Sequence, residues 1–261
     1  AAGYHEAVAR GEDFWQVMVE RYGLSLDVVG GALENIPSDG PLVVVSNHPY
    51  GILDGLMMGH ILSSRRNGDF RILANNVFKK AEDLDRVILP ISFDDTREAM
   101  AENLRTRKEA LRYLGAGGAM GVFPGGTVST SAKPFSAPLD PKWRSFTAKM
   151  IARSEAQVVP IFFEGANSRL FQIASHLHTT LRMALLIKEF KRRTDEPVKV
   201  VVGEPIPADE IARFRTDQSA MMDFLRARTY ALSPTPIVSA DYGFEFETKH
   251  KRADKDGNRD F

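Results

Sequence analysis

The sequence of 261 residues contains no cysteine. This absence excludes disulfide bonds, thiolate nucleophiles and cysteine-ligated zinc. An excess of charge of one sign is also lacking, because 34 Lys and Arg residues balance 34 Asp and Glu residues. Since binding to phosphate backbones relies on a basic surplus, we expect no nucleic-acid partner.

Long apolar runs and several catalytic signatures are missing too. No apolar stretch approaches the roughly 20 residues that a membrane-spanning helix needs. The sequence has neither the G-K-[ST] of a P-loop nor the G-x-S-x-G of a serine hydrolase. His176 and His178 are two residues apart, so on a helix their side chains point to different sides. We therefore expect no metal site and no cofactor.

The residues that are present predict an α/β fold. The chain is 43% hydrophobic, which is enough for a sizeable core in one large domain. Short, continuously apolar runs alternate with amphipathic ones, as in a mostly parallel central sheet flanked by helices. The predicted strands are Pro41–Ser46, Arg71–Ala74, Val87–Ile91, Ala119–Phe123, Val158–Phe163 and Val198–Val202. The predicted helices are Glu6–Arg21, Ile52–Arg66, Thr96–Leu114, Trp143–Glu155, Ser168–Arg193 (with a possible break near Ser175–Thr180) and Ala208–Leu232.

This pattern divides the chain into three parts. Residues 1–30 are predicted to be an N-terminal amphipathic helical segment, residues 31–235 the α/β domain, and residues 236–261 a charged, flexible tail. Within the domain, the stretch Thr127–Lys142 is rich in Pro, Ser and Thr. It is too long for a simple connection, so we interpret it as a lid or binding loop.

The sharpest local feature is the run Ser46–Gly55, SNHPYGILDG, which follows a predicted buried strand and begins a helix. Ligands of open α/β sheets bind beyond the carboxyl ends of the strands, where His48 is expected. A neutral imidazole can take a proton from a hydroxyl, and the Asp54 carboxylate can orient the other ring nitrogen. The competing interpretation is a histidine that caps a turn, with Asp54 as an ordinary helix N-terminal carboxylate.

A second run, Gly121–Ser129, reads GVFPGGTVS and also follows a predicted strand. A Gly-Gly turn after a strand presents backbone N–H groups that can bind an anion, with the hydroxyls of Thr127 and Ser129 nearby. An ordinary glycine-rich turn explains the same residues.

Together these runs resemble the glycerol-phosphate and lysophospholipid acyltransferase superfamily, and most closely its soluble, hemolysin-like bacterial branch. The family's first motif is Asn-His followed by Asp, which corresponds to Asn47, His48 and Asp54. Here five residues separate the histidine and the aspartate, whereas the common motif has four; Gly51 could absorb the difference as a bulge. The resemblance covers roughly residues 42–207.

The remaining blocks follow in the family's order. The motif Phe-Pro-Glu-Gly-Thr, which contributes to acceptor binding, is matched by Phe123, Pro124, Gly126 and Thr127, with Gly125 in place of the glutamate. The second block, Val87–Phe93, implies a basic residue for acceptor binding; Arg97 is our candidate and Arg86 its competitor. The fourth block, Val158–Gly165, implies a structural strand or a wall of the acyl pocket.

The resemblance implies an O-acyltransferase of phospholipid biosynthesis that acts on a lysophospholipid or related lyso-lipid. His48 and Asp54 would be catalytic, and the substrate-binding residues would be Asn47, Arg97, Phe123, Pro124, Gly125, Gly126 and Thr127. The implied partners are an acyl thioester of acyl carrier protein or coenzyme A, and a lipid acceptor at a membrane surface. A cytoplasmic enzyme, peripherally associated with the inner face of the membrane, is expected.

Two other functions remain open on the sequence. A non-catalytic lipid-binding protein would keep the pocket without turnover, and an esterase would transfer the acyl group to water. One further feature bears on the membrane: Lys188, Lys191, Arg192 and Arg193 follow an apolar helical stretch. This arrangement fits docking on anionic lipid, and it equally fits a core helix whose basic end stabilises the helix dipole.

Overall fold

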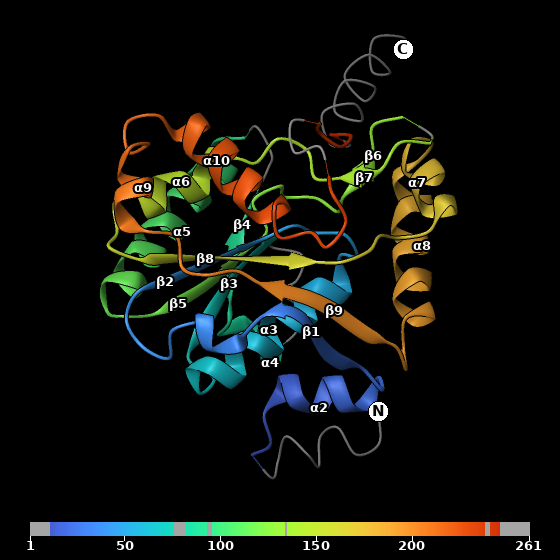
Figure 1. Ribbon diagram of the computed structural model, residues 1–261, viewed down its shortest axis with the longest axis horizontal. Helices are drawn as coiled ribbons and strands as arrows, with labels where there is room; N and C mark the ends of the chain where they lie inside the picture. Colours follow the sequence, from blue (N-terminus) through green and yellow to red (C-terminus); the bar gives the residue numbers. More distant parts are fainter. Residues whose placement is uncertain (1–10, 76–81, 93–95, 134, 238–240, 246–261) are drawn as a thin grey trace.

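The computed structural model describes residues 11–75, 82–92, 96–133, 135–237 and 241–245, which form a seven-stranded sheet between helices (Figure 1). The strand order is β1-β9-β8-β2-β5-β3-β4, and every neighbouring pair is parallel except β8 and β9. The predicted α/β class with a mostly parallel sheet is therefore confirmed. The strands are β1 (Ser25–Gly31), β2 (Leu42–Ser46), β3 (Phe70–Asn75), β4 (Ile88–Ile91), β5 (Ala119–Val122), β8 (Gln157–Phe163) and β9 (Pro197–Val202).

The described residues also form one small hairpin and the helices that cover the sheet. The hairpin pairs β6 (Thr130–Ser131) with β7 (Pro138–Leu139). The helices are α2 (Phe14–Arg21), α3 (Ile52–Arg66), α4 (Glu82–Asp85), α5 (Arg97–Gly115), α6 (Ser145–Ile151), α7 (Arg169–Ser175), α8 (Thr179–Arg192), α9 (Ala208–Ala212) and α10 (Gln218–Tyr230), with a 3₁₀ turn at Leu33–Asn35. None of these helices is both long enough and apolar enough to cross a bilayer.

Strand β2 is buried on both faces, which explains its unbroken apolar sequence. Leu42 and Val44 contribute to the core under α2 and α3, whereas Val43 and Val45 contribute to the core under α5, α6 and α10. The sheet is thus sandwiched between two helical layers (Figure 1).

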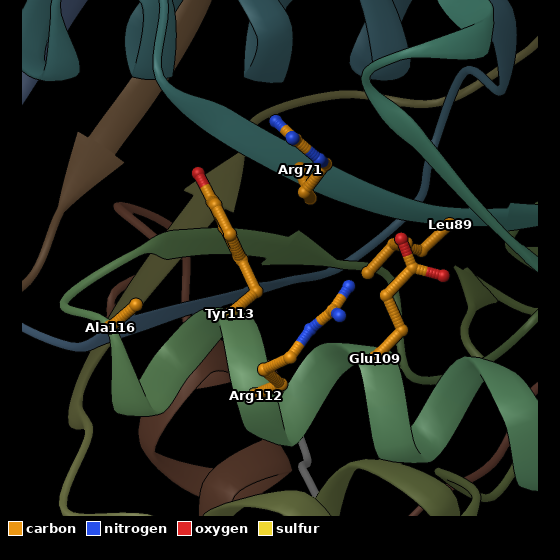
Figure 2. A pocket seen from close by; sticks show the side chains of 6 residues that line it. All are labelled: Arg71, Leu89, Glu109, Arg112, Tyr113 and Ala116. Carbon is orange, nitrogen blue, oxygen red and sulfur yellow. The ribbon is translucent and has the colours of Figure 1, made fainter.

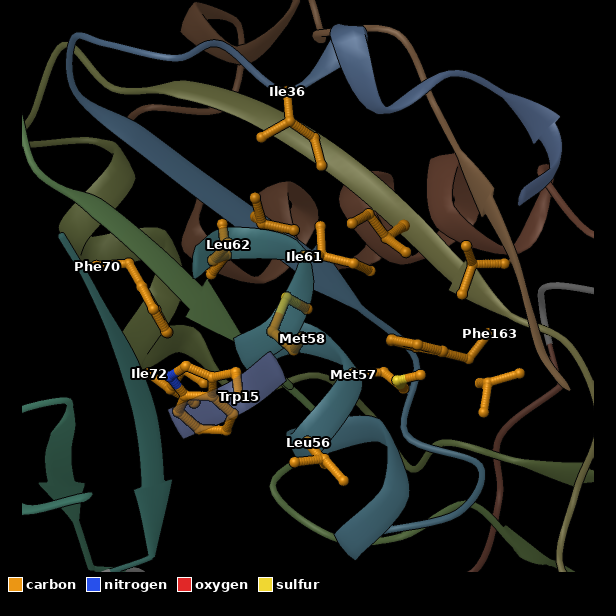
Figure 3. Packing of buried hydrophobic residues seen from close by; sticks show 14 of the residues in the cluster. Trp15, Ile36, Leu56, Met57, Met58, Ile61, Leu62, Phe70, Ile72 and Phe163 are labelled. Atoms are coloured by element: carbon orange, nitrogen blue, oxygen red, sulfur yellow. The ribbon is translucent and has the colours of Figure 1, made fainter. Parts of the chain in front are cut away.

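The core on the α3 side is closed by α2 (Figure 3). Trp15 of α2 lies against α3 at Gly59, where a Cβ atom would come within 2.2 Å of the indole ring. A glycine in mid-helix is therefore explained here by close packing, which offsets its low helix propensity.

Several element boundaries differ from the sequence prediction. Ser25–Gly31 is an edge strand that pairs in parallel with β9, although residues 1–30 were predicted to be a helical segment; residues 1–10 lie outside the described part. The predicted break in Ser168–Arg193 is found between α7 and α8. The single helix predicted over Ala208–Leu232 is interrupted at residues 213–217, between α9 and α10.

Candidate active site

The His48 turn connects the carboxyl end of β2 to the start of α3. Gly51 caps the helix with a φ of +87°, a conformation that a side chain disfavours. Asp54 is the third residue of the helix, and its Oδ2 atom accepts the backbone N–H groups of Tyr50 and Gly51, each at 2.8 Å. The extra residue between histidine and aspartate is thus accommodated in the turn before the helix.

This turn brings the imidazole of His48 to the carboxylate of Asp54. His48 Nδ1 lies 3.0 Å from Asp54 Oδ2; the His48 side chain is 17% exposed, and Asp54 is fully buried. Among the described residues, neither His48 Nδ1 nor Asp54 Oδ1 has a hydrogen-bond partner of standard geometry. The two side chains are nevertheless close enough to form a hydrogen bond, since catalytic hydrogen bonds are often poorly aligned before substrate binds.

Tyr50 fixes the same turn from the other side. Its hydroxyl donates to the carbonyl oxygen of Glu164 at 2.7 Å, and the Arg193 guanidinium lies over its ring at 4.5 Å. Burial raises the pKa of Tyr50 to about 12, although the charge of Arg193 opposes this shift. Tyr50 therefore remains a neutral hydrogen-bond donor that joins the His48 turn to the end of β8.

Phe123, at the end of β5, forms a wall of the site. Its ring stacks on the imidazole of His48, with the centroids 4.2 Å apart and 26° between the planes. The chain then turns at Pro124 and Gly125, and the N–H of Gly126 donates to the Phe123 carbonyl at 3.0 Å. This turn is next to His48, as expected from neighbouring parallel strands, but one of its N–H groups is already used within the turn.

Thr127 lies beside a buried arginine that the sequence analysis did not select. Arg182 of α8 donates from Nη2 to Thr127 Oγ1 at 3.1 Å and to the Val128 carbonyl at 3.2 Å. Its Nη1 atom donates to Thr130 Oγ1 at 2.9 Å. The sequence did contain a signal that Arg182 is buried. It precedes Leu185 and Leu186 by three and four residues, which places all three on the same face of the helix, and that face is buried.

Asp140 is the second residue that the sequence analysis missed. Its carboxylate is fully buried and accepts the backbone N–H of His48 at 3.1 Å, the indole N–H of Trp143 at 2.8 Å and the hydroxyl of Ser129. A Cβ atom at Gly125 would lie 3.3 Å from the Asp140 Cβ atom. Asp140 thus packs against the position where the family motif carries glutamate.

These contacts change the interpretation of Thr127–Lys142. The backbone N–H of Ser129 donates to the His48 carbonyl at 2.8 Å, while Asp140 holds the His48 N–H. Residues 128–131 and 139–141 of the stretch are buried, and they contain β6 and part of β7. The buried parts of the stretch therefore support the His48 turn, and the interpretation of the whole stretch as a lid or binding loop stays a prediction. The Ser129 hydroxyl donates its hydrogen bond to Asp140, so it is not directed to a bound anion as the sequence suggested.

Asn47 is buried, and its amide group bonds to the backbone of β8. Asn47 Nδ2 donates to the Phe163 carbonyl at 2.9 Å, and its Oδ1 accepts the Phe163 N–H at 2.7 Å. These two bonds join the ends of β2 and β8. In the structure Asn47 therefore positions the turn, although the sequence analysis assigned it to substrate binding.

Arg97 is not brought to the site. It is the first residue of α5, is exposed, and follows edge strand β4, three strands from β2 and about 14 Å away at the usual strand spacing. Its competitor Arg86 is exposed and precedes the amino end of β4, so it lies at the opposite end of the strands from His48. Residues 93–95 of the second block lie outside the described part.

A cavity of about 280 Å³ lies away from His48 (Figure 2). It is lined by Arg71, Leu89, Glu109, Arg112, Tyr113 and Ala116. Arg71 is near the amino end of β3 and Arg112 is near the carboxyl end of α5, so the cavity opens far from the carboxyl ends of β2 and β5. It contains none of the residues around His48, and we give it no role in acyl transfer.

Gly51 allows a test of the turn geometry. A Cβ atom there would lie 2.9 Å from Val128 Cγ2 and 3.0 Å from Leu186 Cδ1, in addition to the strain of the positive φ. We expect Gly51→Ala to lower the free energy of unfolding by about 1–3 kcal/mol. Gly55→Ala, four residues along, meets nothing within 4 Å and should instead stabilise the helix by about 0.5–1 kcal/mol. Urea unfolding of both variants measures the difference, and equal effects would contradict this account.

Comparisons with known proteins identify the family to which the chain belongs. A family model described as acyltransferase matches residues 9–236. Two lyso-glycine lipid O-acyltransferases, from Phocaeicola vulgatus and Bacteroides thetaiotaomicron, are 27% and 26% identical to this chain over 217 and 216 residues. Each alignment covers 79% of this chain, and they cover 73% and 75% of the respective relatives.

A solved structure also shows similarity. The crystal structure of the 1-acyl-sn-glycerophosphate acyltransferase PlsC from Thermotoga maritima matches with a TM-score of 0.47 and 18% identity, over 85% of this chain and 81% of that one. The class of protein follows from the family model, which spans most of the chain: it is an acyltransferase. The chain belongs to the acyltransferase family whose model matches residues 9–236.

Proposed function

We propose that this chain is a lyso-lipid O-acyltransferase in which His48 is the general base and Asp54 orients it. The observation that carries the proposal is the 3.0 Å contact between His48 Nδ1 and Asp54 Oδ2, beside the Phe123–Thr127 turn. The names of the two lyso-glycine lipid O-acyltransferases support a lyso-lipid acceptor.

In the proposed reaction, Nε2 of His48 takes the proton from the acceptor hydroxyl as its oxygen attacks the thioester carbonyl carbon. The C–O bond forms, the tetrahedral intermediate collapses, and the C–S bond breaks. The leaving thiolate then receives the proton from the imidazolium. Asp54 keeps the neutral ring in the tautomer with the proton on Nδ1, and it stabilises the imidazolium between the two steps. In this reaction the nucleophile is the acceptor hydroxyl, and no serine of the protein attacks the thioester.

The polar end of the acceptor is proposed to lie at the turn formed by Pro124, Gly125, Gly126 and Thr127. Arg182 supports this turn through Thr127 and contributes positive charge beneath it, although its guanidinium is largely buried. Arg97 remains a predicted acceptor contact only if binding moves the start of α5. The donor is proposed to be an acyl thioester of acyl carrier protein or coenzyme A, and the enzyme to be peripheral to the membrane.

Incubation of the purified protein with a radiolabelled acyl thioester and a panel of lyso-lipids tests the proposal. The expected result is a labelled diacyl product from at least one lyso-glycine lipid or lysophospholipid. Retention of lipid without product would identify a binding protein instead. Release of free fatty acid at the same rate with and without acceptor would identify an esterase.

A further inference from the structure

The hairpin formed by α7 and α8 stands at one end of the sheet (Figure 1). It carries several exposed apolar side chains. Among the residues that the structure describes, seven of the twelve exposed large hydrophobic ones lie on it or on the adjacent loop between β6 and β7. We call these seven side chains the hairpin surface: Phe135, Leu170, Ile173, Leu177, Leu181, Met183 and Ile187. Exposed apolar side chains that are grouped in this way on a protein surface indicate an interaction site.

The loop residue belongs to the same surface as the helices. Arg169, the first residue of α7, donates to the Ser136 carbonyl at 3.1 Å, which places the neighbouring Phe135 beside the hairpin. Gln172 of α7 also accepts the N–H of Ser131 at 2.9 Å. Phe135 is 85% exposed, so its ring projects from the protein with little support.

The charges on the hairpin have one sign, although the chain as a whole is neutral. Arg169, Lys188, Lys191 and Arg192 are all exposed. The one acidic residue within 169–192 is Glu189, which is buried and accepts the hydroxyl and the N–H of Ser168. Exposed apolar residues with basic residues on the same two helices match a lipid surface with anionic headgroups.

The inner face of the hairpin contacts the candidate active site. Leu185 and Leu186 pack with Val128 and Ile52, which belong to the two segments that flank His48. The exposed face is on the other side of the same helix, so it lies about 10 Å from these contacts, one helix diameter away. A lipid lying against the hairpin would therefore be within one molecular length of His48.

We propose that the hairpin surface inserts between the headgroups of an anionic lipid bilayer and holds the candidate active site at the membrane. The exposed apolar side chains contact acyl chains, while Lys188, Lys191 and Arg192 contact acidic headgroups. This inference deepens the proposed function and rests on it for the identity of the acceptor as a membrane lipid; the docking itself is measured without any turnover.

Co-sedimentation of the full chain with vesicles tests the docking. Vesicles of phosphatidylcholine mixed with phosphatidylglycerol are compared with vesicles of phosphatidylcholine alone. We expect the double variant Phe135→Ser, Leu177→Ser to bind the mixed vesicles at least about tenfold more weakly, because two inserted apolar side chains are lost. The matched control is Met100→Ser, Leu104→Ser on α5, two exposed apolar residues elsewhere, which should bind as tightly as the unaltered chain.

A charge variant provides a second, independent measurement. We expect Lys188→Gln, Lys191→Gln to weaken binding to the mixed vesicles by about tenfold or more, to reduce its salt dependence, and to leave binding to phosphatidylcholine unchanged. Thermal unfolding verifies that each variant is folded. Unaltered binding by both double variants, or an equal loss in the α5 control, would overturn the proposal.

The outcomes also separate docking from catalysis. If the unaltered chain transfers no acyl group but sediments in a hairpin-dependent way, docking stands and the proposed function fails. If transfer to a lyso-lipid in detergent micelles is normal in all variants and sedimentation never changes, the function stands and docking fails. A dimer in lipid-free solution that the Phe135→Ser, Leu177→Ser variant disperses would identify the surface as a contact between two copies, which would also overturn the proposal.

Discussion

Replacing His48 by alanine is expected to lower kcat for acyl transfer by about 10³-fold while the protein remains folded. The imidazole is the one basic side chain that the structure holds against both the Asp54 carboxylate and the Phe123 ring. Without the imidazole, the positioned base is gone, and the acceptor hydroxyl must lose its proton to water. Single-turnover assays with a labelled thioester measure the loss, and circular dichroism verifies the fold.

His60 provides a matched control on α3. It is half-buried, and burial lowers its pKa, although the charges of Asp13 and Glu20 at α2 oppose this shift. It is six residues along the helix from Asp54. His60→Ala should therefore keep kcat close to that of the unaltered enzyme. Near-normal transfer by His48→Ala would remove the general-base mechanism.

Asp54→Asn should separate the role of Asp54 in orienting the imidazole from the role of His48 in proton transfer. Asparagine keeps one oxygen to accept the N–H groups of Tyr50 and Gly51, so the helix N-terminus is partly preserved. The negative charge beside Nδ1 is lost, and the imidazolium is no longer stabilised. We expect kcat to fall with little change in KM, and the fall to be smaller than in His48→Ala.

Asp140→Asn is expected to have the largest effect on stability, lowering the free energy of unfolding by about 3 kcal/mol. The carboxylate accepts from the His48 N–H, the Ser129 hydroxyl and the Trp143 indole N–H, all in the interior. An amide has one oxygen, so its NH₂ group must face at least one of these donors. Because the His48 backbone is released, kcat should fall as well.

Urea unfolding measures the effect on stability, and Asp39→Asn is the control because Asp39 is exposed. A loss of activity in Asp140→Asn without a loss of stability would contradict the supporting role and would indicate direct contact with substrate. A loss below about 1 kcal/mol would show that the buried donors find other partners.

The pH dependence of stability gives a further signature of Asp140. Burial raises the pKa of this carboxyl above its usual value of 3.8, although the three donors oppose the shift. The folded state therefore binds the proton more tightly than the unfolded chain. The stability that this proton contributes is fully present below the unfolded pKa, and it is lost as the pH rises through the folded pKa. Asp140→Asn should remove this dependence from the unfolding curves.

The sequence predicted the sheet well because its strands are buried on both faces. Continuous apolar runs such as Leu42–Ser46 and Gln157–Phe163 have few alternatives to a central strand. Ser25–Gly31 was missed because an edge strand is only partly buried, and its sequence SLDVVGG mixes polar, apolar and glycine residues. Its assignment depends on pairing with β9, whose residues follow more than 170 positions later.

The part of the candidate site that lies at the ends of neighbouring strands could also be predicted from the sequence. His48, Asp54 and Phe123 each follow a recognisable strand or begin a helix, and parallel strands bring their carboxyl ends together. Arg97 also follows a strand, but the order of strands places it at the far edge of the sheet. Sequence spacing contains no information on which strands are neighbours.

The amino-acid sequence by itself determined that the chain forms a mostly parallel α/β sheet, and it placed a histidine and an aspartate at the start of one helix. Those features depend on local periodicity and on residues less than two turns apart. The tertiary structure alone decided that Asp140 supports the His48 turn, that Arg182 supports the neighbouring turn at Thr127, and that the apolar hairpin lies beside them. Such contacts join segments 50 to 90 residues apart, because a buried donor or charge is satisfied by whichever group the packing brings to it.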